Sequence, residues 1–535
     1  MPFLCNWIKN CIYPDLSNTT NPQQGDALIG FKQPVVNAIP RTVHDKLSET
    51  ISVKDFGAVG DGINDDTAAI QAAINSVPQT FGIEGGTVFF PAGVYEVTSE
   101  ILISGIRITL QGVGRYATHI RFKPTSDNQT MFKFDRGNAG LSWQCAIQDM
   151  ALVSSLDSGL TKTAIELKDT SNMIVKDLII APWTGNGNSV GLRIRGREAG
   201  HINNLHIYAD RPIVIEKNDA NPINDIDMFN FNDLYLLVSE LDETRYPDKS
   251  LRPCIFIEDG VDLQNVVFGG FQAWVRGSHG LYWKDTTTTE VSYGLILSNI
   301  RTEQTINPIG HSIHVERNAL LQDLLIEHMV TDPGQHGFFF RNIARITLNH
   351  VSYNGNGVAL DVDSKKVNNM SNDPMVELNL DQVKMGIHST VNMPNMQEKI
   401  AFNRSESASP VPDTAYFARK VDSIEQALKL FGSTHVWSYS GELADSDQLT
   451  IPSYTRKAAI IFVSGYGSGP ISAGGQVIDT AEKVYLISGT EKFGIKNSGD
   501  NLDVSGKLVV FHQSNTTIYN RLGVTIDVVV FIMWT

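Results

Sequence analysis

The sequence predicts an all-β chain built around a parallel β-helix, with a short N-terminal head and a small β-rich C-terminal domain. Residues from about 50 to 390 consist of short β-type runs separated by Gly, Asn and Asp, the pattern of strands alternating with turns. In that region a polar residue, usually Asp or Asn, recurs immediately before an apolar residue that opens a strand. The interval varies from 24 to 34 residues, and no helical pattern fills it, which excludes leucine-rich and helical repeats.

This recurrent pair is the most informative feature of the chain. Its instances are Asp149-Met150, Asp177-Leu178, Asn204-Leu205, Asp233-Leu234, Asn265-Val266, Asn299-Ile300 and Asp323-Leu324, with weaker ones at His350-Val351 and Gln382-Val383. One turn and one strand per unit suit a coil whose rungs stack about 4.8 Å apart and bury a continuous core. Asn or Asp at one corner of each rung can hydrogen-bond the backbone and fix the turn. A β-sandwich with accidental spacing is the alternative.

The pattern divides the chain into four parts. Residues 1–45 form the head, 46–395 the β-helix, 396–415 a polar linker, and 416–535 a β-sandwich-like domain that begins with a short helical segment at 421–431. Near the start of the β-helix, Asp65, Asp66 and Thr67 precede an apolar helical pattern over residues 68–77. We interpret the acidic pair as a helix cap rather than a metal site, and the helix as a cover for the open end of the solenoid.

Composition limits the possible partners. The 535 residues carry a net charge of −15, which argues against nucleic acid and anionic membranes as partners. No apolar run approaches the roughly 20 residues of a membrane span, and residues 1–15 make a poor signal peptide, so we expect synthesis in a cytosol and no membrane insertion. Four widely spread cysteines give neither a disulfide framework nor a zinc signature. We expect no metal or other cofactor.

Three segments carry a family resemblance. VKDFGAVGDG (residues 53–62), DDT (65–67) and GGTVFFPAGVY (85–95) resemble the opening of the pectate-lyase-like right-handed β-helix superfamily. RTVHDKLSE (41–49) is similar to the joint between virion-attachment head and β-helix in bacteriophage tailspikes. The resemblance implies a homotrimer on a phage tail, made in the host cytoplasm and acting outside the cell. Its head would contact other tail or baseplate proteins, and its β-helix would bind and usually depolymerise capsule or lipopolysaccharide.

The resemblance is specific for the fold and much less so for the activity, because the superfamily includes lyases, hydrolases, epimerases and non-catalytic spikes. Residues that could carry chemistry are therefore placed by counting from the corner of each rung. Alternate residues of a strand face outward, so the second and fourth positions after the corner are solvent-facing. The fourth positions of two adjacent units are Glu303 and Glu327, which predicts two stacked carboxylates.

Two neighbouring carboxylates cannot both ionise freely, so one becomes a proton donor and the other a base or nucleophile. This division of labour is the one that glycoside hydrolysis requires. We therefore predict hydrolysis by Glu303 and Glu327, with Asp332 as an alternative partner. Arg301 beside Glu303 is a candidate for substrate binding, although an exposed Arg301–Glu303 ion pair of little energetic value is the simpler interpretation.

A lyase on the same fold is the main rival. It needs a base and a group that neutralises a uronate, and His206, Tyr208 and Asp210, or else His328 with Arg301, could supply them. The aromatic residues of the long unit between Asn265 and Asn299 include Trp274, a candidate for stacking on sugar rings or for filling a subunit interface. A third hypothesis is a purely adhesive spike that binds glycan without cutting it.

Overall fold

The computed structural model describes part of the chain, in two compact units. One unit comprises Met1–Asn379 and Val391–Ile400, the other Leu380–Thr390 and Ala401–Thr535. The described residues are 13–21, 23–80, 82, 84–137, 140–154, 159–185, 187–218, 225–239, 252–275, 279–287, 291–304, 310–331, 336–354, 358–363, 377–381, 383–385, 390–392, 400–403, 435–443, 448–450, 459–467, 469–478, 484–488, 493–497, 507–512, 516–521 and 526–534.

The N-terminal segment consists of short elements. They are α2 (Tyr13–Leu16), the 3-10 helix η2 (Gly25–Leu28), β1 (Gly30–Phe31), β2 (Arg41–Thr42), α3 (Val43–Leu47) and the 3-10 helix η3 (Val53–Phe56). β1 and β2 pair antiparallel. Thr42 and Asp45 form a capping box at the start of α3, each side chain accepting from the other's backbone N–H, which satisfies donors that a helix start leaves free.

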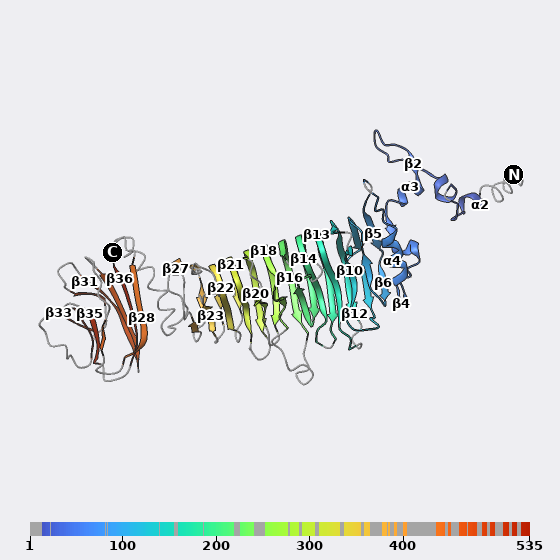
Figure 1. Ribbon diagram of the computed structural model, residues 1–535. Helices are drawn as coiled ribbons and strands as arrows, with labels where there is room; N and C mark the ends of the chain where they lie inside the picture. The colour runs from blue at the N-terminus through green and yellow to red at the C-terminus, as the bar shows by residue number, and fades with distance from the viewer. Residues whose placement is uncertain are drawn as a thin grey trace, which may run out of the picture. The chain divides into compact units, whose positions relative to one another are not determined.

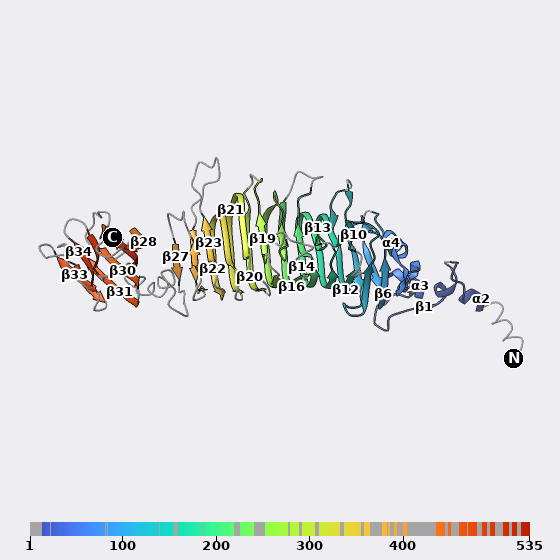
Figure 2. The same cartoon turned by 90° about the horizontal axis from the view of Figure 1, so that it is seen from below.

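Twenty-five described strands form one continuous, hydrogen-bonded solenoid (Figures 1 and 2). They are β3 (Ile51–Ser52), β4 (Asp61–Asp65), β5 (Gly86–Phe90), β6 (Gly93–Val97), β7 (Ile101–Ile103), β8 (Ile108–Gly112), β9 (Thr118–Phe122), β10 (Gln129–Phe134), β11 (Ser142–Trp143), β12 (Ala146–Ser154), β13 (Lys162–Trp183), β14 (Val190–Ala209), β15 (Arg211–Ile215), β16 (Asp225–Val238), β17 (Ile255–Ile257), β18 (Asp262–Val275), β19 (Leu281–Lys284), β20 (Tyr293–Gln304), β21 (His311–Thr331), β22 (His336–Tyr353), β23 (Val358–Asp363), β24 (Glu377–Asp381), β25 (Lys384–Met385), β26 (Thr390–Asn392) and β27 (Ile400–Asn403). The predicted parallel β-helix is therefore confirmed.

Each rung contributes to three parallel ladders, which we call faces A, B and C. One registered row of buried residues defines each face. On face A the row is Val175, Ile202, Phe231, Phe268, Leu297, Ile326 and Leu348. On face B it is Ile180, Ile207, Leu236, Ala273, Thr302, Thr331 and Tyr353. On face C it is Ile165, Leu192, Ile213, Ile255, Leu281, Ile313, Phe338 and Leu360.

These rows are the core, because the residues of all three are buried. Phe231 and Phe268 stack with ring centroids 4.5 Å apart, one consequence of keeping the same side chain in phase on neighbouring rungs. A single rung could not bury this surface, so the core exists only where rungs are stacked.

The corner between faces A and B repeats a left-handed backbone conformation. Asp149, Asp177, Asn204, Asp233, Asn299 and His350 all have φ between 51° and 61°, where Asn and Asp are tolerated better than most residues. Their place in the repeat is as predicted. Two other instances are wrong, because Asn265 and Asp323 lie level with Gly294 at the corner that precedes face A.

In those two rungs the corner between faces A and B is occupied by Gly270 (φ 73°) and His328 (φ 51°). Glycine has no Cβ and enters this conformation freely, and histidine enters it more readily than most side chains. A search for Asn or Asp therefore missed both corners and chose a polar residue five positions earlier. Gln382 lies outside the described residues.

Helix α4 (Thr67–Asn75) begins where the acidic cluster predicts it. Asp65, one residue before the N-cap position, accepts from the first helical N–H, that of Thr67, at 3.0 Å, and so satisfies one of the donors that a helix start leaves free. Asp66 differs, because its carboxylate accepts from the N–H groups of Val59 and Gly60. It fixes the glycine-rich turn that precedes the helix and makes no side-chain cap.

The second unit contains two sheets. One has the order β28-β36-β30-β31-β32 and the other β29-β35-β34-β33. Their strands are β28 (His435–Leu443), β29 (Gln448–Thr450), β30 (Ala459–Gly467), β31 (Gly469–Ile478), β32 (Val484–Ser488), β33 (Phe493–Asn497), β34 (Lys507–His512), β35 (Thr516–Arg521) and β36 (Ile526–Trp534). The small β-rich C-terminal domain is confirmed, the predicted helical segment at 421–431 lies outside the described residues, and β27 forms a strand inside the predicted linker.

The corner conformation gives a stability prediction. Asn299 is exposed with φ 52°, so a β-branched side chain there is strained by about 1–3 kcal/mol. We expect Asn299→Val to lower the thermal unfolding midpoint, whereas Asn299→Gly should leave it nearly unchanged or raise it. Differential scanning calorimetry of the two variants makes the comparison. Equal midpoints for Val and Gly would contradict the role of the corner.

Candidate functional site

Two outward-facing columns run side by side along face B. Registered pairing places His206, Tyr235, Gln272 and Arg301 in one column, and Tyr208, Leu237, Trp274 and Glu303 in the other. The two columns together are called the face B site. Each column crosses four consecutive rungs, or about 14 Å at strand spacing. Columns of this length are suited to an extended ligand.

Aromatic rings line one end of the face B site. His206 and Tyr235 have ring centroids 5.5 Å apart, and Tyr235 and Trp274 are 6.3 Å apart. All three side chains are half-buried, so each still presents a surface to solvent. Burial, with a smaller effect from the positive charge of Arg115, lowers the pKa of His206, which favours a neutral imidazole that can accept a proton.

Glu303 lies at the other end of the face B site, held on two sides. Its Oε1 accepts from Gln272 Nε2 at 2.9 Å and lies 2.7 Å from Arg301 Nε. The side chain of Glu303 is 17% exposed, against 56% for that of Arg301, so the carboxylate is sheltered while the guanidinium reaches solvent. Trp274 is its registered neighbour on the adjacent rung. The site thus presents an oriented carboxylate, a cation and an aromatic side chain together.

The prediction that Glu327 stacks on Glu303 is wrong. Glu327 pairs with Ser298 and Asn349 on face A, whereas Glu303 is on face B. The cause is the corner at His328: counting began at Asp323, five residues too early. Counted from His328, the fourth position is Asp332, which lies outside the described residues.

The remaining predicted residues divide into two groups. His206, Tyr208, Trp274 and Arg301 are brought together with Glu303 in the face B site. His328 is instead an exposed corner residue whose ring lies 4.8 Å from that of His350. Asp210, considered as part of a lyase site, is buried and accepts from the N–H groups of Gly185, Gly187 and Ser189, so it has a structural role. Tyr235 and Gln272 belong to the site and were not predicted.

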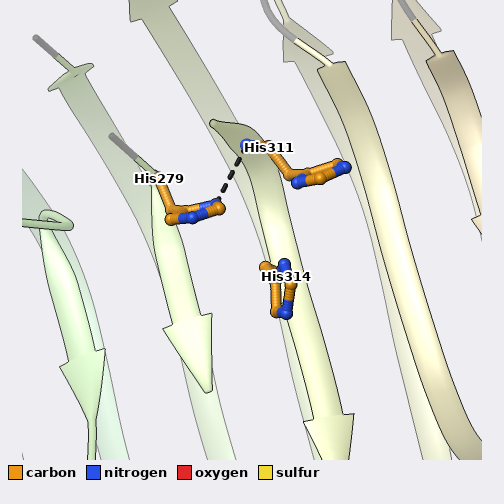
Figure 3. Close-up of side chains that lie close together, drawn as sticks. All are labelled: His279, His311 and His314. Carbon is orange, nitrogen blue, oxygen red and sulfur yellow. Dashed lines mark hydrogen bonds between the residues drawn. The ribbon is translucent and has the colours of Figure 1, made fainter. Parts of the chain in front are cut away.

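Face C carries a second cluster, which sequence reasoning missed. His279 precedes β19, and His311 and His314 lie on β21 of the next rung (Figure 3). One potential ligand nitrogen from each residue lies within 4.8 Å of the others. We call these three residues the histidine cluster. Among the described residues they are the one group of three or more His, Cys, Asp or Glu side chains close enough to hold a metal ion.

Burial holds the histidine cluster in the neutral form. Desolvation, reinforced by the neighbouring imidazoles, lowers the pKa of His279 to about 2 and that of His311 to about 3. Burial also lowers the pKa of His314, against the opposing effect of Glu316. Neutral imidazole is the form that binds a transition metal.

A repeated motif could have revealed the cluster. His279-Gly280-Leu281-Tyr282, His311-Ser312-Ile313-His314 and His336-Gly337-Phe338-Phe339 share a histidine, a small residue, an apolar residue and an aromatic ring. In space the pattern forms a ladder: His311 N–H donates to His279 Nδ1, and Val358 N–H to His336 Nδ1, each at 3.0 Å. The search for Asp and Asn corners passed over this second repeated position.

The fold has counterparts among known proteins. Residues 50–230 match the family described as "Rhamnogalacturonase A/epimerase, pectate lyase-like". The match covers about a third of the chain and agrees with the strands observed there, so the fold is a pectate-lyase-like right-handed parallel β-helix. The tailspike of the Escherichia coli bacteriophage HK620, solved in complex with a pentasaccharide, matches with a TM-score of 0.50 and 12% identity, over 96% of this chain and 98% of that one. That likeness shows the fold alone.

Sequence relatives narrow the class. The tail spike protein of Shigella phage Sf6 is 44% identical over 104 residues, 19% of this chain and 16% of that protein. Mannuronan C5-epimerase AlgE2 of Azotobacter vinelandii is 32% identical over 166 residues, 31% of this chain and 14% of that protein. The chain thus spans about one sixth of these relatives. Together with the fold, the matches support a tailspike of the right-handed β-helix type.

Within the described residues, no helix has both the length and the apolar character that crossing a membrane would require.

The hydrogen bond between rungs gives a second stability prediction. His279→Leu removes the acceptor of the His311 N–H group, so we expect the variant to be less stable by about 1–3 kcal/mol. His279→Asn places a carbonyl oxygen where Nδ1 lies, so this variant should lose much less stability than His279→Leu. Thermal unfolding of the two variants at one pH measures the difference. If both unfold at the wild-type temperature, the hydrogen bond contributes nothing.

Proposed function

We propose that the chain is a virion tailspike that binds a bacterial surface polysaccharide and cleaves it by glycosidic bond hydrolysis at the face B site. The observation that carries the proposal is the arrangement on face B, an open line of His206, Tyr235 and Trp274 leading to Glu303. Sugar rings pack their C–H faces on aromatic side chains, and a wall of this length suits a polymer. The likeness to phage tailspikes, one of them solved with a pentasaccharide, points to a bacterial surface glycan.

Hydrolysis requires a second carboxylate, and we propose that Asp332 supplies it. Thr302 and Thr331 are registered neighbours, and Glu303 and Asp332 are the residues that follow them in the sequence. The distance between the two carboxyl groups decides the stereochemical outcome. A final separation near 5–5.5 Å predicts retention of configuration, and one near 6.5–9.5 Å predicts inversion.

The other residues of the face B site have roles in binding. Arg301, whose Nε lies 2.7 Å from Glu303 Oε1, places a positive charge beside that carboxylate, and we assign Glu303 the part of base or nucleophile. Gln272 donates to the same oxygen and fixes its orientation.

The same proposal includes the assembly and location of the protein. We propose that it forms a homotrimer and attaches to other tail or baseplate proteins through residues 1–45. It would be made in the host cytoplasm and act outside the cell.

A lyase is the second candidate, favoured by one observation. The half-buried His206 beside Tyr235 provides a base whose lowered pKa suits proton abstraction, and Arg301 could neutralise a uronate. The two chemistries give different products. Hydrolysis shortens the polymer without a new chromophore, whereas a lyase leaves a C=C bond that absorbs in the ultraviolet.

We expect Glu303→Gln and Asp332→Asn each to lower the rate of chain cleavage by about 100- to 10,000-fold, the usual contribution of an acid or base, while glycan binding survives. Capsular polysaccharides and O-chains of candidate hosts serve as substrates. Size-exclusion chromatography follows chain length, and ultraviolet absorbance follows unsaturated ends. Glu327→Gln, on face A, is the matched control and should cleave at the wild-type rate. Full activity of Glu303→Gln would refute the assignment, and new absorbance would favour the lyase.

We also expect Trp274→Ala to weaken glycan binding by about fivefold, because an aromatic stacking contact is worth about 1 kcal/mol. Trp143→Ala is the control, since Trp143 is 40% exposed and belongs to β11, away from the face B site. Binding is measured by isothermal titration calorimetry with the cleavage-deficient Glu303→Gln protein as background. Equal loss in both tryptophan variants would mean that the face B site is not where the glycan binds.

A further inference from the structure

The histidine cluster joins two consecutive rungs. His279 directly precedes Gly280 and β19, whose Leu281 pairs in register with Ile313 of β21, and Ile313 lies between His311 and His314 in the sequence. The three side chains therefore project from neighbouring, hydrogen-bonded rungs. In Figure 3 the ring of His279 extends toward β21, the ring of His314 lies in front of β21, and the ring of His311 extends from the upper end of β21 to its other side.

We propose that His279, His311 and His314 bind one divalent transition-metal ion, for which Zn²⁺ is the best-suited probe, and that the ion ties the two rungs together. The proposed site is on face C and is independent of the catalytic proposal for face B.

Unpartnered nitrogen atoms point to a ligand. His311 Nδ1 and both ring nitrogens of His314 are buried without a hydrogen-bond partner in the described part of the chain. His314 Nε2 lies 3.5 Å from Glu316 Oε2, too far for a strong hydrogen bond. His314 is only 9% exposed, so water cannot readily satisfy it. Leaving buried polar atoms unpaired is unfavourable, and a bound cation would remove that penalty.

The donor set defines the class of ion. Three imidazoles suit Zn²⁺, Cu²⁺, Ni²⁺ or Co²⁺, whereas Ca²⁺ and Mg²⁺ prefer oxygen ligands. A tetrahedral Zn²⁺ with Zn–N bonds of about 2.0 Å holds its nitrogen ligands about 3.3 Å apart. The 4.8 Å limit on the present separations therefore requires the rings to close by about 1.5 Å, which rotations about side-chain bonds can supply.

His279 must change its hydrogen bond to join the site. Its Nδ1 now accepts from the backbone N–H of His311, so the neutral ring carries its proton on Nε2. Binding through Nε2 moves that proton to Nδ1 through solvent, with no net release, and the His311 N–H loses its acceptor. One metal–nitrogen bond thus replaces one neutral hydrogen bond, and this exchange favours the metal-bound form.

The surroundings of the cluster fit a metal site. Glu316 reaches towards Nε2 of His314 and could accept its proton when Nδ1 binds the ion, the usual outer-shell role of a carboxylate. The ring of Tyr282 lies 4.7 Å from that of His279, and the ring of Phe339 lies 4.3 Å from that of His314. These rings limit the access of water and hold the imidazoles in place.

The test measures Zn²⁺ binding by the untagged full-length chain after treatment with a chelator. A Cys5→Ser/Cys11→Ser background removes two thiols near the N-terminus that could also bind zinc. Isothermal titration calorimetry should give one ion per chain, and saturation should raise the thermal unfolding midpoint. Co²⁺ in place of Zn²⁺ should show the intense visible absorption of a tetrahedral site.

Two variants separate a ligand from a rung contact. His279→Asn keeps an acceptor for the His311 N–H but lacks Nε2, and His314→Phe keeps the aromatic stack on Phe339 but has no nitrogen. Loss of an outer-shell partner alone costs roughly 10- to 100-fold in affinity, so each should bind Zn²⁺ at least about 100-fold more weakly. His336→Asn is the matched control: it occupies the next position of the same ladder and should bind like the parent.

The site is supported if the parent binds one Zn²⁺ per chain, His279→Asn and His314→Phe lose that binding, and His336→Asn keeps it. Binding that survives in His279→Asn and His314→Phe places the ion elsewhere and overturns the proposal. Absence of binding by the parent overturns it as well, and the cluster is then a hydrogen-bonded ladder alone. Circular dichroism of each variant confirms that a loss of binding is not a loss of fold.

Discussion

The backbone hydrogen bonding between successive rungs is the constraint on which the rest of the structure depends. Every side chain in the solenoid faces the side chain at the registered position one rung away, about 4.8 Å distant. That rule builds the core, since it sets Phe231 on Phe268. It also builds the site, since it sets Trp274 beside Glu303. The residues that share a column therefore decide what a face of this fold can bind or catalyse.

Column position explains what the sequence could and could not predict. The order of the strands, the opening helix and six corners between faces A and B were predictable, because Asp and Asn at the left-handed corner leave a visible repeat. Gly270 and His328 occupy the same corner conformation with different side chains, and there the repeat is invisible to a search for acids and amides. One missed corner at His328 moved Glu327 to the wrong face, although the count for Glu303 from Asn299 was right.

The same reasoning explains which site residues were found. His206, Tyr208 and Arg301 were singled out for their outward positions and their possible chemistry, and Trp274 for stacking on sugar rings. The structure places all four on face B. Tyr235 and Gln272 were passed over although they lie in the same columns, because each sits in the second position of its rung and only the fourth was compared throughout. Gln272 was further hidden by the misplaced corner at Asn265. To predict these two site residues, the pairing register between rungs was needed in addition to the residue types.

Faces B and C show how one scaffold can hold two unrelated arrangements. On face B one column ends in Arg301, whose side chain is 56% exposed, and the other in the more sheltered Glu303, 17% exposed. On face C the strands present imidazoles and aromatic rings so closely packed that burial lowers the pKa of His279 to about 2. Burying imidazole nitrogens without hydrogen-bond partners is unfavourable, and the registered rows of the core are built mostly from aliphatic and aromatic side chains instead. A ligand that takes up their nitrogen lone pairs gives this column a physical reason to differ from its neighbours.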